Sequence, residues 1–170
     1  MSQRDSALFF SVKALKIVGE ILSRIYYKQK ASRSIAYHLS LRFNEWTREL
    51  PPDLHWRGSQ FLAQDPDFVL RRLHINLIYF NGIILLTRPF LLYEINKKLS
   101  EPVNEPPSRS TEQPGSGPRE KSRRPEQAYC FHGACVRSAL NSITAVNAAF
   151  SANALPRRDP FVMQALSAQV

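Results

Sequence analysis

The sequence predicts an all-α protein, and two observations support that prediction. Apolar residues recur at steps of three and four along several long segments, which is the spacing of one face of an α-helix. No segment shows the alternating, β-branched-rich pattern that is typical of strands. We therefore expect a multi-helix bundle around a central buried helix at about 68–97, interrupted by a disordered linker rich in proline and serine at 101–127.

The first expected helix runs roughly from Asp5 to Lys28. Charged side chains fall outside its main apolar stripe, so this stripe is expected to face the core. The stripe consists of Leu8, Val12, Leu15, Val18, Leu22 and Ile25.

A second helix is expected to begin at Ser32 or Ser34, since serine is a favourable N-cap. Pro51 and Pro52 end it, because a proline removes a backbone donor and pushes the preceding residue out of helical geometry. Its core stripe consists of Ile35, Leu39, Phe43, Trp46 and Leu50.

The central helix opens at 65–67, where Asp65 is a suitable N-cap and Pro66 suits the first helical turn. The stretch 73–92 is apolar nearly all round and long enough to span a membrane. A span would place several polar side chains in hydrocarbon, at about 2.5–3.5 kcal/mol for each central charge, so we expect a soluble core helix and no membrane contact. Pro89 predicts a kink or break near Arg88.

Two lines of polar residues run along this helix on roughly opposite sides, with apolar faces between them. One line holds Arg72, Asn76 and Thr87, and the other holds His74, Asn81 and Arg88. The second line has two interpretations. His74 and Arg88 can pair with a carboxylate and hold the helix in register, because a buried charge needs a partner. Alternatively, the three residues line an effector pocket in which arginine binds an anionic ligand.

The segment 101–127 contains six of the twelve prolines and almost no apolar side chains. Such a segment cannot bury enough surface to offset its loss of conformational entropy, so we expect it to be disordered. It separates an N-terminal helical part at 1–100 from a C-terminal part of the same domain at 128–170. A basic run at 119–125 is expected to be solvated, although it also fits a nuclear import signal.

A fourth helix is expected at about 127–150. Its core stripe consists of Val136, Leu140, Ile143, Val146 and Phe150. The segment 153–160 ends it, and a fifth helix opens at 160. Because its apolar pattern is unfinished at the last residue, we expect a truncated gene model or partial protein.

The formal net charge of +9 is spread along the chain without a dense cluster, which favours an acidic partner over direct reading of DNA. The presence of only two cysteines argues against a disulfide-built secreted domain, and no signal peptide is expected, so the cytosol or nucleus is the expected compartment. Cys130, His132 and Cys135 are potential metal ligands. On a helix, however, the two thiols lie about 140° apart and lack a fourth ligand nearby, so we expect no metal site.

No enzyme is expected, and no catalytic residue is assigned. The chain lacks a recognisable nucleophile with its base, a paired-carboxylate motif and a glycine-rich phosphate loop between a strand and a helix. We therefore expect no cofactor in this chain.

Two stretches, LRFNEWTRELPPDL at 41–54 and LHINLIYFNGIILLTRPFL at 73–91, resemble the fungal-specific transcription factor domain. This domain is the middle homology, or regulatory, region of fungal zinc binuclear cluster transcription factors. The likeness extends to the helix at 15–29 and to the helix near Cys135, and Thr87 departs from it where the family often has histidine. The residues that carry it are Trp46, Leu50, Pro51, Leu73, His74, Tyr79, Leu86, Arg88, Pro89, Phe90 and Leu91.

The resemblance implies a regulatory domain that controls transcription in the nucleus. It implies protein partners or self-association through apolar helix faces, and a small-molecule effector. The family contacts DNA through a six-cysteine module that binds zinc, and the two cysteines of this chain cannot form one. The alternative is a stand-alone helical interaction or small-ligand-binding module unrelated to transcription.

Overall fold

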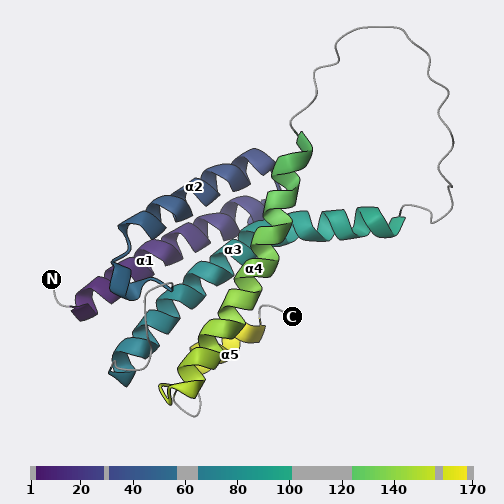
Figure 1. The fold of residues 1–170 in the computed structure, drawn as a ribbon. Helices are drawn as coiled ribbons and strands as arrows, with labels where there is room; N and C mark the ends of the chain where they lie inside the picture. The colour runs from purple at the N-terminus through teal and green to yellow at the C-terminus, as the bar shows by residue number, and fades with distance from the viewer. Residues whose placement is uncertain (1–2, 29–30, 57–64, 101–123, 156–158, 168–170) are drawn as a thin grey trace, which may run out of the picture.

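The computed structural model describes residues 3–28, 31–56, 65–100, 124–155 and 159–167. Within these ranges the elements are helices and no strand occurs, which confirms the all-α prediction (Figure 1). They are the α-helices α1 (Gln3–Ile21), α2 (Arg33–Glu49), α3 (Pro66–Ser100), α4 (Arg124–Ser151) and α5 (Pro160–Ser167), the π-helical turn η1 (Leu22–Tyr27) and the 3-10 turn η2 (Pro52–Leu54).

Most of the predicted linker lies outside the described residues. The helix α4 begins at Arg124, three residues before the start at about 127 that the sequence predicts. Pro125 and Glu126 are compatible with the first turn of α4. Proline lacks a backbone N–H, but in the first helical turn this N–H would have no partner within the helix.

The predicted core stripe of α2 is confirmed from Leu39 onward, while Ile35 is only partly buried. Leu39, Phe43, Trp46 and Leu50 are buried together with Ala36. The indole Nε1 of Trp46 donates a hydrogen bond to the Phe10 carbonyl at 3.0 Å, which ties α2 to α1. Ion pairs Lys13–Glu49 and Arg42–Glu20 lie at the edges of the same interface.

α1 buries a different face from the predicted one. Four of the six expected core residues are exposed, namely Leu8 (68%), Val12, Leu15 and Leu22. Of the other two, Ile25 is buried as predicted and Val18 is partly buried. The stripe that is buried instead holds Ala7, Phe10, Ala14, Ile17 and Ile21. Both stripes have three- and four-residue spacing, so periodicity cannot choose between them, whereas the small alanines allow close packing of helices.

The predicted core face of α4 is also wrong. Val136, Leu140 (58%), Ile143 and Phe150 are exposed, and Val146 is only partly buried. The buried face is made of small residues, namely Cys135, Ser138, Ser142 and Ala149. Its small side chains let α4 lie close to α3, with which it makes its most extensive contacts.

α3 is packed on more than one side and changes direction along its length (Figure 1). On the side of α1 and α2, an apolar cluster includes Ile75, Ile78 and Leu86 of α3. On the side of α4 and α5, a second cluster includes Val69, Leu73 and Leu77. Among the described residues, α3 is the one helix long and apolar enough to cross a membrane, and half of its most apolar window is buried inside the structure.

The helix remains continuous through Pro89. Proline has no N–H with which to bond the carbonyl of Leu85, four residues earlier. The hydroxyl of Tyr26, in the π-helical turn, donates a hydrogen bond to this carbonyl at 2.8 Å. Burial raises the pKa of Tyr26, Arg88 lowers it and Cys135 raises it further, with a net upward shift that keeps the phenol in its donor form.

The chain reverses after α4 in a left-handed helix cap. Asn153 has a φ of 52°, and its N–H donates to the Phe150 carbonyl at 3.0 Å. The N–H of Ala154 donates to the Ala149 carbonyl at 3.0 Å, which completes the hydrogen-bond pattern of a Schellman motif. This turn leads the chain back towards α5.

Candidate functional site

The three polar residues predicted to form one site, His74, Asn81 and Arg88, do not meet. His74 contacts the start of α5, Asn81 lines a groove between α1 and α5, and Arg88 borders a different cavity near Tyr26. An α-helix places residues seven apart on one line, but each lies about two turns from the next. They therefore face different neighbours.

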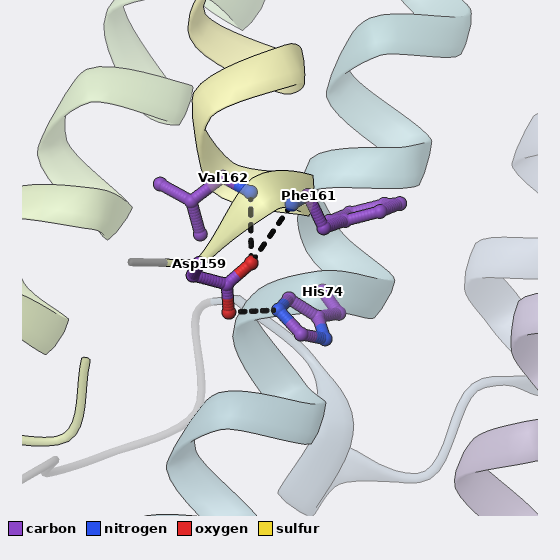
Figure 2. Close-up of polar contacts among 4 residues, drawn as sticks. All are labelled: His74, Asp159, Phe161 and Val162. Carbon is purple, nitrogen blue, oxygen red and sulfur yellow. Dashed lines mark hydrogen bonds and ion pairs between the residues drawn. The ribbon is translucent and has the colours of Figure 1, made fainter. Parts of the chain in front are cut away.

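His74 is paired with a carboxylate, that of Asp159. Its Nε2 lies 2.9 Å from Oδ2 of Asp159 (Figure 2). The other oxygen, Oδ1, accepts hydrogen bonds from the backbone N–H groups of Phe161 at 2.9 Å and Val162 at 3.1 Å. Asp159 is thus the N-cap of α5, with Pro160 at the first helical position.

The electrostatics of Asp159 follow from these contacts. Burial acts to raise the pKa of its carboxyl group, but the hydrogen bonds from Val162, His74 and Phe161, together with the electrostatic attraction of His74, outweigh burial and lower it. The ring of Phe161 packs against the His74 imidazole, with 4.8 Å between ring centroids. One carboxylate therefore caps α5 and anchors it to the N-terminal third of α3.

The anchored α5 forms one wall of a groove of about 300 Å³. Its floor is α3 and its other wall is α1. The lining residues are Leu15 and Val18 of α1, Ile78, Asn81, Ile84 and Leu85 of α3, and Phe161, Gln164 and Ala165 of α5. Such a groove, apolar with few polar groups, has the composition of a small-molecule site and lies at the lower end of the usual volume range.

Asn81 is the polar residue of the groove floor. Its carboxamide makes no hydrogen bond to the residues that the structure describes, and its Oδ1 is buried. Buried polar groups are paired in most proteins, and an unpaired one costs roughly 1–3 kcal/mol. Asn81 is thus a polar group to which the described part of the fold supplies no partner.

Arg88 is exposed, and no carboxylate within the described ranges lies within ion-pair distance of it. It lines an open cavity of about 470 Å³ together with Ile25, Tyr26, Ala31, Pro89 and Leu92. The predicted structural ion pair therefore involves His74 and leaves Arg88 outside it.

The opposite polar line of α3 is more deeply buried than the predicted site. Arg72 is 1% exposed, and its Nη2 donates to the His55 carbonyl at 2.8 Å. The Nδ2 of Asn76 donates to the Leu54 carbonyl at 3.0 Å. Burial lowers the pKa of Arg72, and the charge of Asp53 opposes this shift. These residues fasten the loop after α2 onto α3.

The cysteine and histidine motif lies at the start of α4. Cys135 is buried and His132 is half-buried, while the side chain of Cys130 lies outside the described set. Among the side chains that are described, no three histidine, cysteine or acidic residues gather closely enough to hold a metal ion. The absence of a metal site stays a prediction.

Asp159 is the site residue that sequence reasoning missed. The pair Asp159-Pro160 repeats the pattern of Asp65-Pro66, which predicts the start of α3. The same signal predicts an N-cap at 159. Its contact with His74 spans 85 positions of the chain, and no local pattern predicts a pairing at that distance.

Comparison of the chain with protein-family models, curated proteins and solved structures gives no match.

Proposed function

We propose that the chain is a regulatory domain of a fungal transcription factor, acting in the nucleus and associating with a second copy of itself through α4. In this proposal, α3 is the central helix of one bundle built from 1–100 and 128–170. Contact with DNA and zinc belongs to a separate cysteine-rich module.

The residues that carry the family resemblance support a shared fold. Trp46, Leu73, Leu86 and Phe90 are all buried. The indole of Trp46 stacks on the ring of Tyr79, with 5.5 Å between centroids. These four motif residues are thus core residues, and the contact of Trp46 with Tyr79 joins α2 to α3, which is the role that a fold-defining motif would have; Arg88 of the motif is exposed.

The proposed self-association is based on one observation, the exposed apolar stripe of α4. We call Val136, Leu140, Ile143, Asn147 and Phe150 the α4 stripe; all five are exposed. Its steps of four and three residues repeat as in a coiled coil, whose two apolar positions face a partner helix. A monomer in water gains nothing from such a stripe.

Two features favour a second copy of α4 as the occupant. Asn147 occupies a position equivalent to that of Leu140, and an asparagine at one such position specifies pairing with an identical residue across a dimer. Arg137 flanks the N-terminal end of the stripe, but the other neighbouring residues Ala139, Thr144, Val146 and Ser151 are uncharged, so charge repulsion between two copies is confined to that end despite the net charge of +9.

Self-association is tested by sedimentation of the full chain over a range of concentrations. Leu140→Glu should weaken association about tenfold or more, because it places a charge in an apolar interface. Leu92→Glu is the matched control, since it alters an exposed leucine on α3 (49%, against 58% for Leu140). A chain that stays monomeric at all concentrations, or equal effects of the two variants, would contradict the proposed contact.

The transcriptional role is tested by tethering. The chain is fused to an unrelated DNA-binding domain in yeast, and a reporter gene and the location of the fusion are followed. We expect nuclear accumulation and a change in reporter output that Leu140→Glu removes and Leu92→Glu preserves. In a gel-shift assay, the chain alone should bind DNA only weakly and in a salt-sensitive manner. Tight, sequence-specific binding would contradict the proposal that DNA contact belongs to a separate module.

The alternative is a stand-alone interaction or ligand-binding module without a link to transcription. The groove beside Asn81 favours it, because such a groove needs no nuclear partner. A chain that self-associates through α4 but leaves the tethered reporter unchanged would support this second function.

A further inference from the structure

The side chains that line the groove between α1, α3 and α5 indicate which class of ligand it can bind. Its walls are apolar side chains, including Leu15, Ile84 and Phe161. Its polar groups are two carboxamides, Asn81 on the floor and Gln164 on α5. None of the described side chains that line it is charged, so these residues offer no counter-charge to an anionic or cationic ligand.

Asn81 is the polar group that most requires a partner. Its Oδ1 is buried and accepts no hydrogen bond from the described residues. A carboxamide offers an acceptor at one end and a donor at the other, and the two ends can exchange by rotation. A hydroxyl group can donate to the oxygen or accept from the nitrogen, so it suits either orientation.

We infer that this groove binds an apolar small molecule that carries a hydroxyl group, with the apolar body between α1 and α5 and the hydroxyl on Asn81. The ligand fills a volume of about 300 Å³ that is otherwise lined by unsatisfied apolar surface. It also supplies the partner that the fold does not give to Asn81. This site goes beyond the proposed transcriptional role and does not depend on it.

The ligand also contacts the helix whose position depends on His74. Phe161 faces the imidazole of His74 and lines the groove, and Asp159 holds this end of α5 in place. A molecule seated between Phe161 and Leu15 therefore adds contacts to α5 and stabilises its docked position. Binding and the docking of α5 are thus expected to strengthen each other.

The test uses two probes of nearly the same shape, 2-naphthol and 2-methylnaphthalene, which differ by a hydroxyl in place of a methyl group. Binding to the full chain is followed by naphthalene fluorescence and by the rise in the midpoint of thermal unfolding. We expect saturable binding of both probes, with 2-naphthol bound about three- to tenfold more tightly because it gains one hydrogen bond.

Asn81→Leu should abolish the preference for 2-naphthol while still binding 2-methylnaphthalene. Asn96→Leu is the matched control, because Asn96 lies on the same helix and is exposed. It should retain the preference. Ala165→Leu, which fills the groove from α5, should weaken both probes about tenfold. If this variant fails to fold, the comparison of Asn81→Leu with Asn96→Leu still decides the matter.

Three results would overturn the inference. The first is equal affinity for the two probes in the unaltered chain, or a preference that persists in Asn81→Leu. The second is the absence of saturable binding of either probe. The third is binding that weakens as the protein concentration rises in step with dimer formation, since a second copy of the chain would then cover the groove.

Discussion

α2 and α4 both pack against α3 and both carry apolar residues at steps of three and four, yet α2 buries its large residues and α4 exposes them. α2 places Leu39, Phe43 and Trp46 in the core. α4 packs through Cys135 and Ser138 and turns Leu140 outward. The difference shows that the stripe with the largest side chains is not always the one that a helix buries.

The physical reason lies in the distance between helices. A face of alanine, serine and cysteine lets two helix backbones approach closely, so backbone and side-chain contacts are numerous even though each side chain is small. A face of leucine and isoleucine keeps the helices farther apart, but buries more apolar area for each residue. In α4 the small-residue face packs against α3, and in our proposal the face with the larger side chains is left for a second copy of the chain.

The same substitution, phenylalanine to alanine, should give the largest difference in stability between α2 and α4. Phe43 is 0% exposed, and Phe43→Ala should lower the free energy of unfolding by about 3–5 kcal/mol through lost burial and a residual cavity. Phe150 is 70% exposed, and Phe150→Ala should change it by no more than about 0.5 kcal/mol. Urea unfolding at a low, monomeric protein concentration measures both. Similar losses would mean that the α4 stripe is buried in the monomer.

Substitution of two glycines by alanine should change the stability of the protein in opposite directions. A Cβ at Gly82 would lie 2.4 Å from the Phe43 ring, which is held in the core, so Gly82→Ala should destabilise the protein by about 1–3 kcal/mol. A Cβ at Gly19 on α1 would meet nothing within 4 Å. Gly19→Ala should therefore stabilise the monomer by about 0.5–1 kcal/mol through helix propensity. Thermal unfolding of both variants checks the signs, and a loss of stability in Gly19→Ala would contradict the exposure of that face.

These residues also show where sequence reasoning succeeds and where it fails. Helical periodicity and the Asp-Pro and Pro-Pro signals place all five α-helices, since these are local properties. The buried faces of α1 and α4 could not be predicted, because two stripes of equal spacing lie side by side and only the packed neighbours choose between them. The same limit applies to the candidate site. Helix geometry aligns His74, Asn81 and Arg88, but the elements opposite them come from distant parts of the chain.

A smaller effect is expected where α5 is anchored, beside the small-residue face of α4. Asp159→Ala should lower the free energy of unfolding by about 1–2 kcal/mol, because it removes the N-cap of α5 and the partner of His74. Urea unfolding at neutral pH measures the loss. Asp67→Ala, an exposed carboxylate in the first turn of α3, is the control and should lose less.

The same carboxylate predicts a dependence on pH. The pKa of Asp159 in the folded protein is below its usual value of 3.8. Its contribution to stability is therefore fully present above pH 3.8, and is lost as the pH falls through the lowered folded-state pKa. Asp159→Asn keeps a good N-cap residue but cannot titrate, so its loss of stability between pH 5 and pH 2 should be smaller than that of the unaltered chain. Parallel acid profiles would show that Asp159 is not stabilised by its contacts.

The smallest expected effect compares two adjacent tyrosines at the end of the π-helical turn η1. Tyr26 donates to the Leu85 carbonyl that Pro89 leaves without its usual partner, so Tyr26→Phe should lower the free energy of unfolding by about 0.5–1.5 kcal/mol. Tyr27 is exposed and should tolerate the same change without measurable loss. Pro89→Ala restores an N–H four residues after Leu85, so in that background Tyr26→Phe should have a smaller effect. A double-mutant cycle by urea unfolding measures the coupling, and strict additivity would mean that the tyrosine does not compensate for the proline.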